Sequence, residues 1–443
     1  MEINIFDRYD AQSKKLIHSL ETAGIHRDNY FVHYDGDLPA QGSSPYSYFT
    51  GIGSQEKEGL FFDKVKIPQF YGIRHIDGGS ANIEYLDRVV GKIHYRDEGY
   101  RLVNTVEWYS AENIQLPVKV DRYNRYGQHY STTFTNENGA YLTEYYDASG
   151  DLIISENLMP YSLVLHDRLG EKHFDNLTQF FIYYLKIINV NVSGTYINSL
   201  SYPLFISRLL GIRRGTTLFW QEPLADDVPG NMKDELITPK ALNQVVFMNY
   251  NHMLKVAKLF PKTEIGLNYL SPIGEFVREN HFRMSAFILT NSDNIYGIRD
   301  ILTSFPELNV TIAAYTNMSQ KLLHLEDEFS QLTLIPSIDQ DQLSIALAES
   351  DIYLDINYGL KVDHIIERAY QQHMIILSYK EVAQYDTNSL IFEDVRDLCN
   401  NLSYILTDRT NWQTLMTKMI DKNGIQSTIK DYQKTLNEHV IKA

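Results

Sequence analysis

Near the start of the chain, a short apolar run typical of a strand is followed by apolar positions with the spacing of a helix. Residues 3–6 form a short apolar strand, and three apolar side chains then fall on one face of a helix expected over residues 11–23. Gly24 is placed to end this helix, and a second strand is expected over residues 30–34. A strand, a helix and a second strand in this order predict the start of a parallel, doubly wound sheet.

The period changes over residues 45–157, where short alternating runs are rich in Tyr, Val, Ile and Thr. Turn sequences such as Asn138-Gly139 and Ser149-Gly150 separate these runs. Alternation interrupted by tight turns predicts an antiparallel β-meander, inserted into the first lobe.

Alternation of helices and strands returns near residue 158. After a linker with Pro272 and Gly274, a second series of strands is expected at residues 286–290, 310–314, 332–335, 352–355 and 374–377. The predicted parts are an N-terminal Rossmann-like lobe (1–44 and 158–272), an inserted β-meander domain (45–157) and a C-terminal Rossmann-like lobe with closing helices (273–443). Two such lobes form the α/β GT-B architecture of nucleotide-sugar glycosyltransferases.

Composition and charge exclude several classes of function. The 443 residues include 40 basic and 56 acidic side chains, and the formal charge of -16 disfavours nucleic acid as a partner. A single cysteine, Cys399, cannot form an internal disulfide and suggests a reducing setting. The first residues lack the features of a signal peptide, and no run of about eighteen apolar residues occurs. We therefore expect a cytoplasmic protein without a transmembrane segment.

The stretch after the first strand of the second lobe is informative about donor chemistry. A retaining GT-B enzyme places Arg and Lys there, because its diphosphate leaving group develops negative charge. Here the stretch reads FILTNSDNIYGIRD, so Asn291, Ser292, Asp293 and Asn294 occupy those positions, and Arg299 in the following helix is the cation nearby. This pattern predicts a donor site that has lost its charged residues.

A second donor motif is also incomplete. An active enzyme carries two glutamates eight residues apart, of which the earlier contacts the sugar and the later contacts the ribose. Glu367 matches the later position, whereas the earlier position holds Gly359. Glu367 could equally be an ordinary charge in the first turn of a helix. Asn291, Asn294, Gly359 and Glu367 are therefore predicted to mark a degenerate donor site, with no catalytic residue.

No metal site or cofactor is predicted. Asp339 and Asp341 imitate a D-x-D motif, but Asp339 is placed as the N-cap of a helix expected at 342–348. The histidines lack H-x-x-x-H and H-E-x-x-H spacing, and no Walker loop or G-x-S-x-G motif occurs.

Basic and aromatic residues alternate in the inserted region. Such a surface can hold an extended polypeptide by edge pairing, tyrosine contacts and hydrogen bonds. The alternative is a solvated sheet face with ordinary cross-strand pairs. The residues predicted to bind an acceptor or a partner are Tyr46, Tyr48, Arg74, Tyr95, Arg122, Tyr123, Arg125 and Tyr126.

Several stretches together resemble the GtfB family of accessory Sec glycosyltransferase-stabilising proteins. They are INIFDRYDAQSKKLIHSLETAGI, SSPYSYFTGI, RYNRYGQHYSTTFTNENGAYLTEYYDASG and SDIYLDINYGLKVDHIIERA, and they lie in both lobes and the insertion. None of them is a catalytic signature, so the resemblance depends on their number and order.

The resemblance implies a GT-B pseudo-enzyme that binds an active paralogue, GtfA, in a two-plus-two heterotetramer. It also implies that the pair transfers N-acetylglucosamine from UDP-N-acetylglucosamine to Ser and Thr of an unfolded serine-rich repeat adhesin. In this assembly the chain would be a stabilising, acceptor-binding and chaperone-like subunit. Peripheral contact with the inner face of the cell membrane is a further implication.

Two alternatives stay open at this point. One is an active retaining transferase with an unusual donor site, in which Glu367 contacts the nucleotide and Arg299 or Lys361 supplies the missing charge. The other is a sugar-binding or assembly protein without an enzyme partner.

Overall fold

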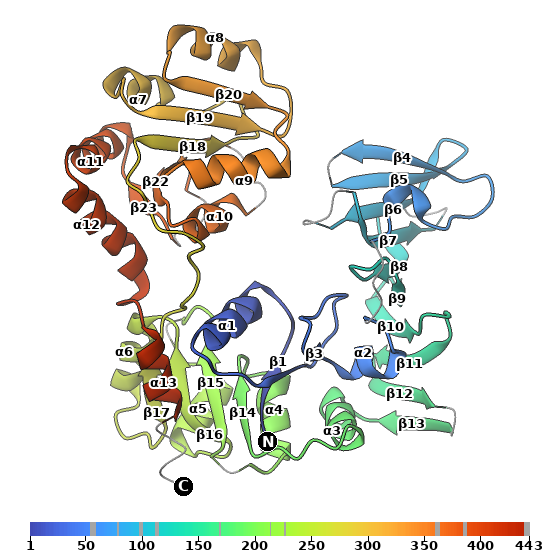
Figure 1. Cartoon of the computed structure of the whole chain (residues 1–443). Helices are drawn as coiled ribbons and strands as arrows, with labels where there is room; N and C mark the ends of the chain where they lie inside the picture. The colour runs from blue at the N-terminus through green and yellow to red at the C-terminus, as the bar shows by residue number, and fades with distance from the viewer. Residues whose placement is uncertain are drawn as a thin grey trace. The chain divides into compact units, whose positions relative to one another are not determined.

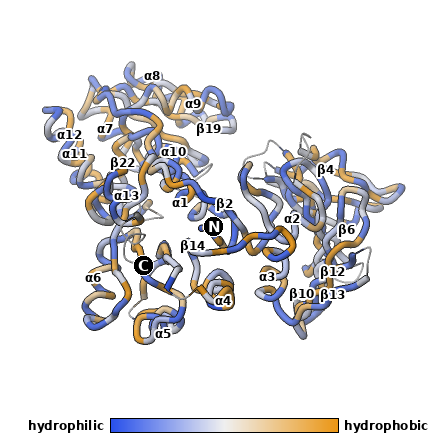
Figure 2. Tube along the Cα trace, turned by 60° about the horizontal axis from the view of Figure 1, so that its bottom comes forward, coloured by the Kyte–Doolittle hydropathy of each residue, from blue (hydrophilic) through white to orange (hydrophobic). Residues whose placement is uncertain are grey.

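The computed structural model describes residues 1–53, 59–77, 79–96, 101–110, 115–167, 170–212, 214–225, 227–358, 364–383 and 388–437. The chain divides into two units, Met1–Tyr269 and Leu270–Ala443, and each is considered by itself (Figure 1). Along the tube in Figure 2, hydrophobic and hydrophilic stretches alternate within each unit, as expected for elements with one buried and one exposed face.

The first unit contains a seven-stranded parallel sheet in the order β17-β16-β15-β14-β1-β2-β3. Its strands are β1 (Glu2–Phe6), β2 (Asp28–Phe31), β3 (Gly42–Ser43), β14 (Gly194–Ile197), β15 (Thr216–Trp220), β16 (Leu242–Phe247) and β17 (Gly266–Tyr269). Its helices are α1 (Ala11–Thr22), α3 (Leu177–Ile187), α4 (Tyr202–Leu209), α5 (Gly230–Ile237) and α6 (Tyr250–Leu259). The predicted first helix is confirmed, because Asp10 caps α1 by accepting from the Ser13 amide.

The same unit contains a ten-stranded antiparallel sheet whose strands follow chain order, drawn from blue to green in Figure 1. The strands are β4 (Gly72–Asp77), β5 (Ser80–Tyr85), β6 (Arg88–Tyr95), β7 (Val103–Tyr109), β8 (Pro117–Tyr123), β9 (His129–Asn136), β10 (Gly139–Tyr146), β11 (Leu152–Leu158), β12 (Tyr161–Asp167) and β13 (Gly170–Phe174).

This sheet begins and ends later along the chain than the predicted 45–157. At its start, Pro45–Thr50 forms helix α2 instead, because Ser44 caps it and Pro45 fits the first helical turn. At its end, Leu163 and Leu165 of β12 alternate with more exposed neighbours and continue the buried face, so two further strands join the sheet.

The second unit contains a six-stranded parallel sheet in the order β20-β19-β18-β21-β22-β23. Its strands are β18 (Ser285–Leu289), β19 (Asn309–Ala314), β20 (Leu332–Pro336), β21 (Ile352–Asp355), β22 (Ile375–Tyr379) and β23 (Leu390–Phe392). Its helices are α7 (Ile298–Ser304), α8 (Gln320–Glu328), α9 (Gln340–Glu349), α10 (Ile365–Gln371), α11 (Val395–Thr407), α12 (Arg409–Ile420) and α13 (Ile429–Asn437). All residues of β21 and β22 are buried, as expected for parallel strands covered on both faces.

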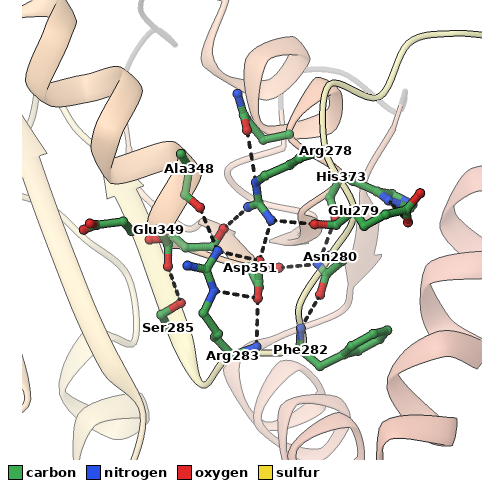
Figure 3. Close-up of polar contacts among 12 residues, drawn as sticks. Arg278, Glu279, Asn280, Phe282, Arg283, Ser285, Ala348, Glu349, Asp351 and His373 are labelled. Carbon is green, nitrogen blue, oxygen red and sulfur yellow. Dashed lines mark hydrogen bonds and ion pairs between the residues drawn. The ribbon is translucent and has the colours of Figure 1, made fainter.

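A buried carboxylate fixes the segment that leads into β18 (Figure 3). Asp351, whose side chain is 0% exposed, lies 2.7 Å from Nη1 of Arg278 and 3.0 Å from Nε of Arg283. Arg278 also donates to the Ser350 carbonyl, and Arg283 donates to the Ala348 carbonyl at 2.7 Å. Burial alone would raise the pKa of Asp351, but the hydrogen bonds from Arg283 and Arg278 outweigh it and lower that pKa.

We predict that Asp351→Asn lowers the free energy of unfolding of the second unit by about 3–5 kcal/mol, because two guanidinium groups lose their counter-charge. The folded pKa of Asp351 is depressed, so its stabilisation is present above the unfolded value of about 3.9 and is lost as pH falls through the folded value. Urea unfolding followed by tryptophan fluorescence, to which Trp412 contributes from the second unit, tests both points at pH 7 and at lower pH. Asp293→Asn, an exposed carboxylate in the same unit, is the control, and an equal effect of the two variants would contradict the prediction.

Candidate functional site

The strand order of each parallel sheet indicates where ligands could bind. β1 lies next to β14, and β18 lies next to β21. The connection after β1 leads to β2 and the one after β14 leads to β15, on the opposite side, and the connections after β18 and β21 diverge in the same way. In open α/β sheets a crevice forms at this switch point, beyond the carboxyl ends of the strands. Each unit therefore has one candidate site, defined by the loops after β1 and β14 or after β18 and β21.

In the second unit, the loop after β18 is organised by its own short polar side chains. The Thr290 hydroxyl donates to the Ser292 carbonyl at 2.7 Å, and the Ser292 hydroxyl accepts from the Asn294 amide at 3.1 Å. Asn291 and Asn294 are exposed. Lys321 of α8 donates to the side-chain oxygen of Asn294 at 3.3 Å. The predicted replacement of cations by amides in this loop is thus accompanied by one lysine from another helix.

The cation that the sequence places near this loop is part of an ion pair. The Arg299 guanidinium donates to both carboxylate oxygens of Glu328 at 2.6 and 2.9 Å, in a pair exposed at the surface. Its role in supplying charge to a donor stays a prediction. Lys321 lies 27 residues from Asn294 in the sequence, so the sequence of the loop does not indicate that this lysine contacts it. Glu367 is exposed in the first turn of α10, and its role as a donor contact stays a prediction. Gly359 and Lys361 lie outside the described residues.

In the first unit, polar side chains gather at the carboxyl ends of β1, β2 and β14. Arg8 donates to both carboxylate oxygens of Asp35 at 2.8 Å, and His33 lies 3.8 Å from Asp7. The Asp7 amide donates to the side-chain oxygen of Asn198 at 3.3 Å. The His33 ring also packs edge-on against Tyr202 at a centroid distance of 5.4 Å. We call Asp7, Arg8, His33, Asp35, Asn198 and Tyr202 the N-edge cluster.

The ionisation of the N-edge cluster favours neutral ligands. Burial raises the pKa of Asp7, and nearby Asp10 and Asp35 add to this effect against Arg8. Burial and Arg8 together lower the pKa of His33 to about 4, so its ring is neutral at pH 7. Because Asp35 balances the charge of Arg8, the cluster presents hydrogen-bonding groups and no excess of positive charge. Such a surface suits hydroxyl and amide groups better than a diphosphate.

A second buried carboxylate connects the antiparallel sheet to α2. Glu156 on β11 accepts hydrogen bonds from the hydroxyls of Tyr46 at 3.2 Å, Tyr145 at 3.2 Å and Tyr161 at 2.8 Å. Burial raises the pKa of Glu156, while these bonds and the charge of Arg8 oppose the rise. The interaction with Arg8 indicates that this group lies near the N-edge cluster. Tyr46 and Glu156 are 110 residues apart, so no local pattern in the sequence indicates their contact.

The eight residues predicted from the insertion do not form one surface. Tyr46 and Tyr95 are 1% and 6% exposed, so neither ring is available to a ligand on the surface, which corrects the prediction for both. The Tyr46 ring packs against Tyr145 and Phe180, and the Tyr95 ring packs against Phe62 and His75, so both lie within hydrophobic clusters. Tyr48 is exposed on α2, and Arg74 pairs with Glu84 at 2.8 Å at the β4 edge of the sheet.

Of the other four predicted residues, Arg125 contacts the loop that follows β2. It forms an ion pair with Asp37 at 2.9 Å, donates from its amide to the Gly36 carbonyl at 3.1 Å, and also contacts the Tyr126 hydroxyl at 2.7 Å. Arg122 donates to the Thr133 hydroxyl at 2.6 Å, and the Tyr123 carbonyl accepts from Arg96 at 2.8 Å. The part of these four residues in acceptor or partner binding stays a prediction, and Arg125 contacts the same loop that carries His33 and Asp35.

Membrane-spanning helices and metal-binding groups are both absent from the described residues. No helix in that part of the chain has both the length and the hydropathy needed to cross a bilayer. No group of three or more His, Cys, Asp or Glu side chains there is arranged to hold a metal ion.

Comparison with known proteins assigns the chain to a family. Models described as the GtfB N-terminal, middle and third domains match residues 3–49, 71–175 and 177–259, and one described as the GftB/GlyA-F C-terminal domain matches 286–419. The UDP-N-acetylglucosamine–peptide N-acetylglucosaminyltransferase stabilizing protein GtfB of Streptococcus agalactiae is 30% identical over 434 residues, covering 94% of this chain and 97% of the relative. The chain belongs to the GtfB family. This result confirms the resemblance found in the sequence.

Solved structures confirm the fold expected of a GtfB family member. A chain in the crystal structure of a GtfA/B complex bound to UDP and GlcNAc matches with a TM-score of 0.91 and 28% identity, over 99% of both chains. The pneumococcal O-GlcNAc transferase GtfA in complex with UDP and GlcNAc matches with a TM-score of 0.53 and 12% identity over 99% of both chains, which shows a shared fold alone. The predicted α/β, GT-B-like architecture is therefore confirmed. The matched GtfB middle domain coincides with the ten-stranded sheet, β4 to β13.

We predict that Tyr161→Phe lowers the free energy of unfolding by about 2 kcal/mol, because Glu156 loses a hydrogen bond to its carboxylate. The folded pKa of Glu156 lies above the unfolded value of about 4.3, so stability falls as pH rises through this interval, and the variant should lose more than the wild type. Urea unfolding at pH 4 and pH 7 measures both effects. Tyr141→Phe, which changes an exposed tyrosine on β10, is the matched control. Indistinguishable results for the two variants would rule out a stabilising role of the bond between Tyr161 and Glu156.

Proposed function

We propose that this chain is a non-catalytic subunit that stabilises an active O-GlcNAc transferase and holds its acceptor polypeptide. The similarity to GtfB stabilising proteins over nearly the whole chain is the observation that carries the proposal. The relatives' names connect them with peptide N-acetylglucosaminyl transfer, and the structure with a TM-score of 0.91 comes from a complex with GtfA. The proposed partner is accordingly a GtfA-type paralogue, in a heterotetramer.

The charges of the two candidate sites support a division of labour between the subunits. A retaining transferase needs cations to stabilise the departing diphosphate, and the loop after β18 holds Asn291 and Asn294 at those positions, with Lys321 reaching it from outside. The N-edge cluster instead offers balanced hydrogen-bonding groups. The donor chemistry is therefore assigned to the paralogue, and acceptor contacts are assigned to the N-edge cluster and to Arg122, Tyr123, Arg125 and Tyr126, of which Arg125 contacts the loop that carries His33 and Asp35.

The proposed acceptor is an unfolded serine-rich repeat adhesin, modified on Ser and Thr before export through the accessory Sec system. Hydroxyl and amide groups dominate such a polypeptide, and these groups match the hydrogen-bonding character of the N-edge cluster. The proposed location is the cytoplasm, with peripheral contact at the inner face of the cell membrane. The family resemblance supports this location.

A second function deserves a test because Lys321 does reach the loop after β18. One cation beside Asn294 could assist a diphosphate, which would make the chain an active retaining transferase with an unusual donor site, using Glu367 at the ribose. The two functions differ in whether the chain acts alone.

The decisive experiment measures transfer of labelled N-acetylglucosamine from its UDP donor to a serine-rich peptide by this chain, by the GtfA-type paralogue and by their mixture. We expect transfer to require the paralogue and to increase when this chain is added. In the mixture, Arg8→Gln should raise the KM for the peptide severalfold, because Asp35 loses its partner and the N-edge cluster loses its balance.

Arg214→Gln, which removes the arginine of the exposed ion pair between Arg214 and Glu264 in the same unit, is the matched control and should leave the KM unchanged. Lys321→Gln and Glu367→Gln should leave the rate of the mixture unchanged as well. Transfer by this chain alone, abolished by either of those two variants, would refute the non-catalytic assignment.

A further inference from the structure

A cavity of about 710 Å³ lies at the amino ends of the strands of the second unit. It is lined by residues 279–282, which precede β18, by His373, which precedes β22, and by residues of α12. Sites for small ligands typically have volumes of roughly 300–1,000 Å³. The cavity is at the edge of the sheet opposite the loops after β18 and β21, so it is separate from the donor site described above.

The wall formed by residues 279–282 is held by buried hydrogen bonds (Figure 3). Asn280 is 6% exposed, and its side-chain amide donates to the carbonyls of Asp351 at 3.1 Å and His373 at 2.8 Å. The Asn280 side-chain oxygen accepts from the Phe282 amide at 2.9 Å. Phe282 has a φ of 61°, a left-handed conformation that bulky residues rarely adopt. Backbone strain of this kind is typical of binding sites, where the surrounding bonds maintain it.

The Phe282 ring supports a guanidinium group at the cavity. The Cζ atom of Arg409 lies 4.2 Å from the centroid of the Phe282 ring, which itself packs edge-on against Trp412 at 5.7 Å. The neighbouring Asp408 caps α12 by accepting from the Thr410 amide at 2.7 Å. No carboxylate among the described residues forms an ion pair with Arg409. A guanidinium that stacks on a ring keeps its N–H donors in the plane available to an anion.

The other titratable groups of the lining leave this charge without compensation. The side chain of Glu279 is 86% exposed, and its carboxylate lies 3.4 Å from Nδ1 of His373. Burial lowers the pKa of His373, although Glu279 opposes this effect, so the imidazole is neutral at pH 7. The His373 ring is also stacked on Phe276 at a centroid distance of 4.0 Å. Arg409 therefore supplies the permanent positive charge of the cavity.

We propose that this cavity binds a small aromatic carboxylate. One guanidinium can donate two parallel hydrogen bonds to one carboxylate, which matches the single arginine of the lining. The aromatic body of the ligand would pack against Phe282 and Met416, which also line the cavity. Gln413 and Thr417, both exposed on α12, offer hydrogen-bonding groups to polar substituents of the ligand.

This inference does not depend on the proposed function, because the cavity shares no residue with the N-edge cluster or with the loop after β18. A bound ligand would contact the segment before β18, the turn before β22 and α12 at once. Since a ligand that binds the folded state alone stabilises that state, occupancy of the cavity would stabilise the second unit.

The test is fluorine NMR on the full chain with para-fluorophenylacetate, with its neutral analogue para-fluorophenylethanol, and with UDP as a competitor. We expect saturable broadening of the carboxylate signal, about tenfold weaker binding of the alcohol, and no displacement by UDP. Arg409→Gln should weaken binding of the carboxylate by about tenfold and leave binding of the alcohol unchanged. Arg396→Gln, which changes an exposed arginine on α11 of the same unit, should leave both unchanged.

A second variant tests the location of the site independently of its charge. Thr417→Trp should fill the cavity from an exposed position on α12 and abolish binding of both probes. Its midpoint of urea unfolding should equal that of the wild type, and Gln413→Trp replaces it if the midpoint falls. Equal affinity for the acid and the alcohol, unchanged binding in Arg409→Gln or in the tryptophan variant, or displacement by UDP would overturn the inference. Absence of binding at about 10 mM carboxylate would overturn it as well.

Discussion

The strand order of each parallel sheet reverses between two neighbouring strands, and this constraint determines where chemistry can occur. β1 pairs with β2 and β14, and β18 pairs with β19 and β21. The connections after β1 and β14 run in opposite directions, as do those after β18 and β21, and the loops after these strands lie where open α/β sheets form a crevice. The N-edge cluster and the bridge between the loops after β18 and β21 both result from this topology, although they come from different parts of the chain.

The loops at this point of the topology carry different side chains and contacts in the two units. In the first, acids and bases near β1 balance one another, as Arg8 does with Asp35, and burial keeps His33 neutral. In the second, the loops after β18 and β21 are joined by backbone bonds and present tyrosine rings. Among the residues that the structure describes, neither edge concentrates the positive charge that a diphosphate leaving group needs, and this supports the proposed binding role.

Buried carboxylates hold the irregular parts of the structure in register. Asp351 ties the segment before β18 to the end of α9, and Glu156 ties α2 to strands β10, β11 and β12. Each carboxylate accepts several bonds at once, so the desolvation of the charge is offset by partners from separate segments. The helix that follows β3 is thereby fixed beside the sheet that the family comparison matches to the GtfB middle domain.

The sequence by itself determined the architecture, and it predicted a donor site without its charged residues. Hydrophobic periods of two and about 3.6 residues are local, so they located both parallel sheets, the antiparallel sheet and helix α1. They failed at the ends of the antiparallel sheet. At its start, capping by Ser44 favours a helix over the alternating pattern of a strand. The absence of cations after β18 was equally local and could be read directly from Asn291 and Asn294.

Only the tertiary structure decided which side chains meet. It buried Tyr46 and Tyr95, paired Arg299 with Glu328, and brought Lys321, Glu156 and the N-edge cluster to places that no spacing indicated. These contacts join residues up to 191 positions apart, as between Asp7 and Asn198. They depend on how strands are ordered within a sheet, which is set by packing of the whole unit and leaves no periodic trace in the sequence.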